Sequence, residues 1–100
     1  MLRFIKVSGA SLSPEIGEGD FVLISKIPFC MNSLHAGDVV VFNHAAYGTL
    51  IKRIETVLQG GEAYFVVGSD EFSVDSRRFG PIDRDDLIGK VIWHIRRSER

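Results

Sequence analysis

Residues 37–42 read Gly-Asp-Val-Val-Val-Phe, and residues 19–24 read Gly-Asp-Phe-Val-Leu-Ile. In both stretches a Gly-Asp turn leads into four consecutive apolar residues, which is typical of a buried β-strand. Gln59-Gly60-Gly61-Glu62 has the character of a hairpin turn between two further strands. We expect strands at 2–7, 20–26, 38–42, 49–58, 63–67 and 87–95. The sequence therefore predicts an all-β domain, either a small coiled sheet or a partly closed barrel, with long loops near 27–37 and 68–86.

Length and composition restrict the possible classes of protein. One hundred residues suffice for one domain, 1–100, but not for two. The 45% apolar and 25% charged fractions are those of an ordinary globular chain. A net charge of −1 gives no field that would hold nucleic acid. We read the basic tail, 96–100, as a solvated end, and one helical turn is expected at Ser13-Pro14-Glu15-Ile16.

The longest unbroken run of aliphatic and aromatic residues, 63–67, has five residues, whereas a membrane span needs about 20. We therefore expect no transmembrane segment, no signal peptide and a cytoplasmic location. The single cysteine, Cys30, cannot form an internal disulfide and fits a reducing compartment. Ile27-Pro28-Phe29-Cys30-Met31 leaves three alternatives open: packing on the core, lining a groove, or contact with a membrane surface from a peripheral position.

One serine and one lysine stand out as candidates for chemistry. Ser11 lies among small residues, and Gly9 and Ala10 before it would let another backbone come close. A serine hydroxyl needs a base to become a nucleophile. Strand alternation places Lys52 between Leu50 and Ile54 on one face, where burial would lower its pKa and favour the neutral amine. The alternative is a lysine at a sheet edge whose amine reaches water.

The segment 68–81 is polar and contains Ser73-Val74-Asp75-Ser76-Arg77. Ser73 could hydrogen-bond a lysine amine, and Asp75 could pair with Arg53 or Arg77. The alternative is a solvated loop closed by its own Asx and Ser turns.

Other candidates are weaker. His35, His44 and His94 have no carboxylate at a suggestive spacing, so a Ser-His enzyme using His44 or His94 is a minor alternative. One cysteine and three scattered histidines form no zinc pattern, and no phosphate loop is present, so we expect no metal and no cofactor. We read Asp83-Arg84-Asp85-Asp86 as a solvated turn.

Taken in order, these segments resemble the signal peptidase I superfamily, which also includes mitochondrial inner-membrane peptidases and LexA-type self-cleaving repressors. Gly9-Ala10-Ser11-Leu12-Ser13-Pro14 is similar to a Gly-x-Ser-Met-x-Pro pattern. The other matches are Gly19-Asp20, Gly37-Asp38-Val39-Val40, Ile51-Lys52-Arg53, the segment 68–80 and the segment 87–91. The resemblance covers about residues 5–95. The short length and Phe79-Gly80-Pro81 look most like the small soluble nickel-type superoxide dismutase maturation proteases.

The resemblance implies the fold of the signal peptidase–LexA catalytic domain and a Ser/Lys-dyad endopeptidase that removes an N-terminal leader or pro-segment. Ser11 would be the nucleophile, with its backbone N–H in the oxyanion hole. Lys52 would be the general base and then the general acid. Ser73 would orient Lys52, and the partner would be a protein or peptide with its leader bound in extended form. Arg53, Asp75 and Arg77 would be structural supports.

Two departures from the pattern support an alternative, a non-catalytic peptide-binding domain of the same fold. Gly9 stands where some bacterial members carry a serine that donates to the oxyanion, which leaves the second donor open. Gly68-Ser69-Asp70 stands where the family has Gly-Asp-Asn.

Overall fold

The computed structural model describes residues 2–7, 16–17, 19–26, 34–69 and 73–96. Over this part of the chain the protein is almost entirely β, which confirms the predicted class. The strands are β1 (Leu2–Lys6), β2 (Phe21–Lys26), β3 (Val39–His44), β4 (Gly48–Leu58), β5 (Ala63–Val67), β6 (Ile82–Asp83) and β7 (Leu87–Ile95). The helical elements are α1 (Ser76–Phe79) and the 3-10 turns η2 (Gln59–Gly61) and η3 (Arg84–Asp86).

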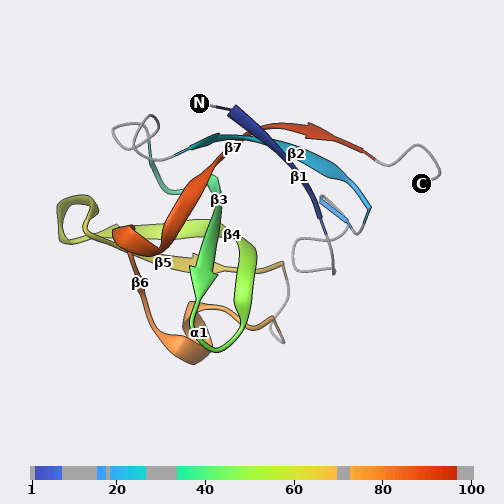
Figure 1. Ribbon diagram of the computed structural model, residues 1–100. Helices are drawn as coiled ribbons and strands as arrows, with labels where there is room; N and C mark the ends of the chain where they lie inside the picture. The colour runs from blue at the N-terminus through green and yellow to red at the C-terminus, as the bar shows by residue number, and fades with distance from the viewer. Residues whose placement is uncertain (1, 8–15, 18, 27–33, 70–72, 97–100) are drawn as a thin grey trace.

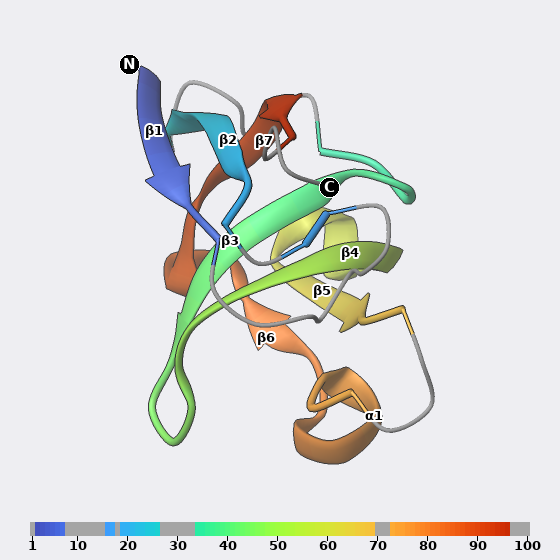
Figure 2. The same cartoon turned by 90° about the vertical axis from the view of Figure 1, so that its right-hand side faces the viewer.

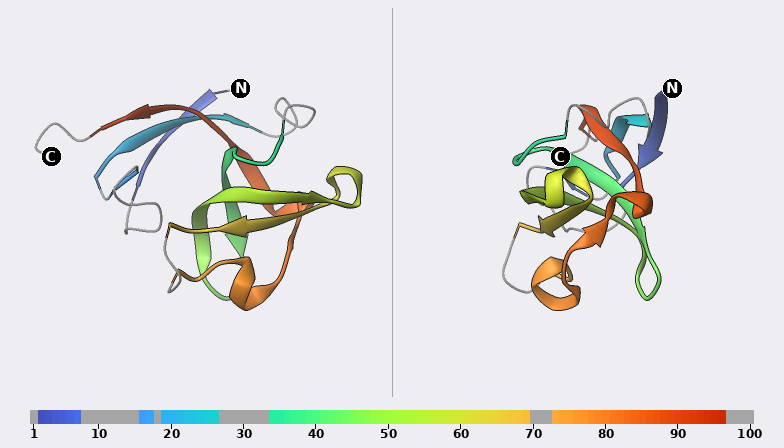
Figure 3. Two further views of the ribbon diagram at one scale, coloured as in Figure 1. Left: turned by 180° about the vertical axis from the view of Figure 1, so that it is seen from behind. Right: turned by 90° about the vertical axis from the view of Figure 1, so that its left-hand side faces the viewer.

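The strands form one seven-stranded antiparallel sheet in the order β1-β2-β7-β3-β4-β5-β6. In Figure 1 the sheet bends over itself, with β1, β2 and the far half of β7 above β3, β4 and β5. The view from behind in Figure 3 shows the same two halves. Because β1 and β6 are the two edges, the described strands form a coiled sheet and do not close into a barrel.

Strand β7 belongs to both halves of the sheet. It pairs with β2 through Gly89–Ile95 and with β3 through Leu87–Lys90, and each pairing has a register shift. Such bulges bend a strand and increase its twist. At the crossing a Cβ on Gly89 would lie 2.6 Å from the carbonyl oxygen of Ser25, so only glycine fits there.

Strand β3 separates two hydrophobic cores. Val40 and Phe42 face one cluster, while Val39 and Val41 face the other. A strand covered on both faces shows an unbroken apolar run rather than alternation, which explains the pattern at 39–42. The first core also contains Leu34, Ile54, Tyr64, Val66, Ile82 and Leu87, and the second Val7, Ile16, Val22 and Ile24.

The predicted loop at 68–86 needs correction, and most of two other predicted segments lies outside the described residues. The predicted loop at 68–86 contains α1, β6 and η3, elements of two to four residues that are too short to leave a periodic pattern. Most of the predicted loop at 27–37 is outside the described residues, including 27–31. So is the predicted helical turn except Ile16, which forms an isolated bridge. In the described ranges no helix has the length and apolar character that crossing a membrane requires.

Candidate functional site

Lys52 lies in the middle of β4, directly opposite Val40 of β3. The residue is 1% exposed, and Ile54 on the same face is also buried, so the predicted alternation is confirmed. The alternative of an edge lysine that reaches water is wrong. Burial this complete disfavours the charged form of an amine.

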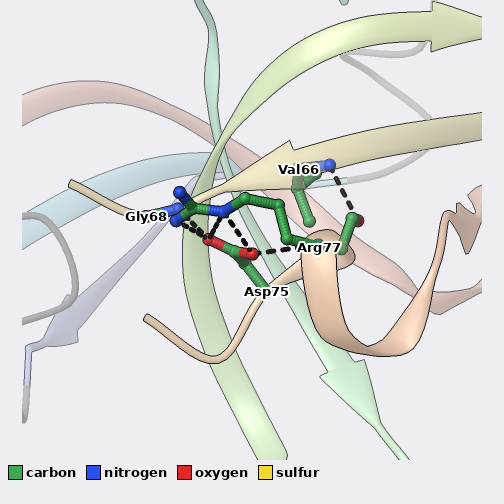
Figure 4. A network of polar contacts seen from close by, with 5 residues as sticks. Val66, Gly68, Asp75 and Arg77 are labelled. Carbon is green, nitrogen blue, oxygen red and sulfur yellow. Dashed lines mark hydrogen bonds and ion pairs between the residues drawn. The ribbon is translucent and has the colours of Figure 1, made fainter. Parts of the chain in front are cut away.

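A second buried charge lies in the segment that follows β5 (Figure 4). Asp75 is 0% exposed and accepts hydrogen bonds from the Gly68 N–H at 2.7 Å and from the Arg77 N–H at 3.0 Å. The Arg77 guanidinium pairs with the same carboxylate, with Nη2 2.5 Å from Oδ2. Burial alone would raise the pKa of Asp75, but the donors from Arg77 and Gly68 outweigh it and hold the pKa below its ordinary value.

These bonds dock α1 on the sheet. Asp75 is the N-cap of α1, and the Ser76 hydroxyl oxygen accepts the Val66 N–H at 2.9 Å. The last residues paired between β4 and β5 are Arg53 and Val67, so the register places Gly68 beside Lys52, one position further along. The Asp75 network therefore fixes the chain where it leaves β5 next to Lys52.

The other predicted supports occupy different places. Of the two pairings expected for Asp75, the one with Arg77 is present. Arg53 donates from Nη1 to the Gly37 carbonyl oxygen at 3.2 Å, and so holds the turn before β3. Ser73 is half-buried two residues before Asp75, and its hydrogen bond to Lys52 stays a prediction. Ser11, Gly9 and Ala10 lie outside the described residues.

A hollow of about 280 Å³ lies between β1 and the first half of β4. Both apolar and polar residues line it, and one of them is Val7, the last described residue before the segment with Ser11. β1 is an edge strand, and the β4–β5 pairing begins only at Arg53. β1 and the first half of β4 therefore each have an edge without a partner strand among the described residues. The lining residues of the hollow are Ile5, Lys6, Val7, Val41, Thr49, Leu50 and Ile51.

One interaction was missed by sequence reasoning. Asp20 is 0% exposed, and its Oδ2 lies 2.6 Å from Nε2 of His94. No carboxylate stands at a suggestive spacing from His94 in the sequence, but the fold brings Asp20 to it. The partners are 74 residues apart, so no local spacing reveals them. The usable signal was that Gly19-Asp20 leads directly into a strand predicted to be buried, where an aspartate needs a partner. His44 has structural contacts: its Nδ1 accepts the Ala46 N–H, and its ring centroid lies 4.4 Å from that of Phe79 in a tilted arrangement.

No cluster of three or more His, Cys, Asp or Glu side chains arranged to hold a metal occurs in the described ranges. The acidic stretch 83–86 consists of η3 and its N-cap Asp83, whose N–H donates to the Asp86 carboxylate at 3.3 Å. Arg84 reaches across to Glu62 at 3.0 Å. These side chains have structural partners.

Comparison with known proteins assigns the family. The model of a family described as "Signal peptidase, peptidase S26" matches residues 1–61 and 56–95. The chain is also similar to signal peptidase I V of Bacillus subtilis (strain 168), with 24% identity over 136 aligned positions that cover 86% of this chain and 81% of the relative. The narrower likeness to nickel-type superoxide dismutase maturation proteases stays a prediction. Because the family model matches most of the chain, this protein belongs to the signal peptidase family, peptidase S26, and is a serine peptidase of the signal peptidase type.

Proposed function

We propose that this chain is an endopeptidase in which Ser11 and Lys52 form the catalytic dyad and which removes an N-terminal leader from a protein substrate. The observation that carries the proposal is the burial of Lys52, which is 1% exposed in a member of a peptidase family. A buried ammonium is costly, so the environment favours the neutral amine. A neutral amine is a competent base for a serine hydroxyl.

The reaction then needs no group beyond the chain and water. Lys52 takes the hydroxyl proton of Ser11 as Oγ attacks the scissile carbonyl carbon. When the tetrahedral intermediate collapses, the C–N bond breaks and Lys52 returns the proton to the leaving amine. Water, activated by the same amine, hydrolyses the acyl-enzyme. The Ser11 backbone N–H stabilises the oxyanion, and Ser73 orients Lys52.

The hollow beside β1 supports an extended substrate. A leader that pairs with the edge of β1 would place alternate side chains in the hollow, as in other cases of β-strand addition. Val7, which lines the hollow, is four residues before Ser11 in the sequence. Gly9 and Ala10 would leave room for the substrate backbone near the nucleophile.

The dyad is tested by cleavage of quenched peptides with small residues before the scissile bond. Ser11→Ala and Lys52→Met, the latter close in size but without an amine, should each lose at least about 1,000-fold in kcat/KM. Lys26→Met removes another partly buried lysine and should stay within about twofold of wild type, since Lys26 has no place in the mechanism. Equal cleavage by all variants would end the proposal. A peptide that binds but is never cut would favour the non-catalytic alternative.

The same proposal predicts the pH dependence of kcat. The active form of Lys52 is deprotonated, so activity should be lost as pH falls and should rise with pH along a single titration. The measurement is kcat from pH 6 to 9.5 with peptide in excess. A flat profile across this range would contradict the role of Lys52.

One observation favours a second candidate mechanism. The Asp20 carboxylate next to His94 is the arrangement that orients a histidine base in Ser-His-Asp enzymes. If His94 were the base, Lys52→Met would retain activity and His94→Gln would abolish it. The buried Lys52 makes the dyad the better supported reading.

A further inference from the structure

Asp20 is a buried carboxylate that the proposed mechanism does not use. It is 0% exposed and lies directly before β2. Its Oδ2 accepts the Gly17 N–H at 3.0 Å and is 2.6 Å from Nε2 of His94. A carboxylate this buried is stable only when its oxygens have donors, so these contacts hold Asp20 against Gly17 and His94.

The backbone of Asp20 joins this turn to the end of β1. The Val7 N–H donates to the Asp20 carbonyl oxygen at 2.7 Å, and the Gly19 N–H donates to the Val7 carbonyl oxygen at 2.9 Å. The end of β1 and the start of β2 accordingly lie side by side in Figures 1 and 2. Val7 and Ile16 flank the segment 8–15 that contains Ser11. Hydrogen bonds therefore join the chain before that segment to the chain after it, and we call the residues that make them, Val7, Gly17, Gly19 and Asp20, the junction.

His94 connects the junction to the far half of β7. It stands opposite Val22 in the β2–β7 pairing, and its side chain is 22% exposed. Asp38 and His94 both line a second hollow. The Asp38 carboxylate forms an ion pair with Lys90 at 3.4 Å. The Nε2 of His94 is directed at Asp20 and so serves the junction.

We propose that His94 and Asp20 are positioning residues for the peptidase reaction. His94 holds the Asp20 carboxylate, and Asp20 fixes the junction through which the chain enters and leaves the segment with Ser11. The proposal rests on Ser11 being the nucleophile. Because displacement of a reacting group by about 1 Å can cost on the order of 100-fold in rate, loss of this pair should lower kcat while binding of the leader, as KM, changes little.

The test compares His94→Leu with His94→Gln. Leucine removes the donor, whereas the side-chain N–H of glutamine can occupy the place of Nε2–H. We expect His94→Leu to lose about 10- to 100-fold in kcat with KM within about twofold. The backbone amides of Val7, Gly17 and Gly19 should exchange hydrogen faster in the same variant. Gln should restore both measurements to within about threefold of wild type.

His35→Leu is the matched control, because His35 also faces an aspartate, Asp38, at 4.0 Å but is 75% exposed. It should change neither kcat nor the three exchange rates. Unchanged kcat in His94→Leu, or a lower kcat with unchanged exchange, overturns the proposal. A Gln variant as inactive as Leu also overturns it, since His94 would then be transferring protons. If Ser11 is not the nucleophile, Ser11→Ala will cleave as fast as wild type. The exchange rates in His94→Leu show whether His94 holds the junction, whatever the result for Ser11→Ala.

Discussion

Asp75 and Asp20 are both fully buried carboxylates, but their partners come from different distances along the chain. The partners of Asp75 are Gly68 and Arg77, seven and two residues away. Asp20 also has a local donor in Gly17, but its closest partner, His94, is 74 residues away. A buried carboxylate needs hydrogen-bond donors. Asp75 has donors that are close in sequence, whereas Asp20 also has His94, which lies on another strand of the sheet.

The difference determines what each carboxylate can control. Asp75 organises one loop and the start of α1, so it fixes the chain next to Lys52. Asp20 joins β7 to the junction of β1 and β2, which flanks the segment that contains Ser11 in the sequence. The two sides of the proposed dyad thus have separate anchors, and each anchor can be removed without touching the other.

The largest effect is expected for Asp75→Ala. It leaves the half-buried Gly68 N–H without its acceptor, removes the cap of α1 and frees Arg77, which should destabilise the fold by about 3 kcal/mol. Arg77 is 40% exposed and can return to water, so the cost should stay below that of a fully buried pair. Urea unfolding at pH 7 measures the change. Asp85→Ala, an exposed aspartate of η3, is the control, and a loss under about 1 kcal/mol for Asp75→Ala would contradict the anchor.

Most of the sheet could be predicted from the sequence, because unbroken or alternating apolar runs report burial directly. The buried face of Lys52 followed from Leu50 and Ile54, and the pairing of Asp75 with Arg77 followed from their closeness in sequence. α1 and β6 were missed because elements of four and two residues have no period to detect. The contact of Asp20 with His94 was missed because it depends on β2 lying next to β7, which no local pattern encodes.

Protonation of Asp75 in acid should lower the free energy of unfolding by less than Asp75→Ala does. Its pKa is lowered in the folded state from an ordinary value of 3.8, so its stabilising contribution is complete above that value and is lost as pH falls below it. Asp75→Asn cannot titrate at this position. The gap in unfolding free energy between wild type and Asp75→Asn should be constant from pH 7 to 5 and should narrow below about pH 4. A gap that widens in acid would mean that the folded state does not favour the charged carboxylate.

The smallest effect is expected for the exposed ion pair of Arg84 with Glu62. Its N–O distance of 3.0 Å equals that between Arg77 Nε and Asp75 Oδ1, but the side chains are 45% and 63% exposed, whereas Asp75 is fully buried. Water already solvates both ions, so Arg84→Ala should cost no more than about 0.5 kcal/mol by urea unfolding, and less at 0.5 M salt. If Arg84→Ala cost as much as Asp75→Ala, the distance between the ions would matter more than their burial. Burial of the carboxylate would then not be what makes the loss of its partner costly.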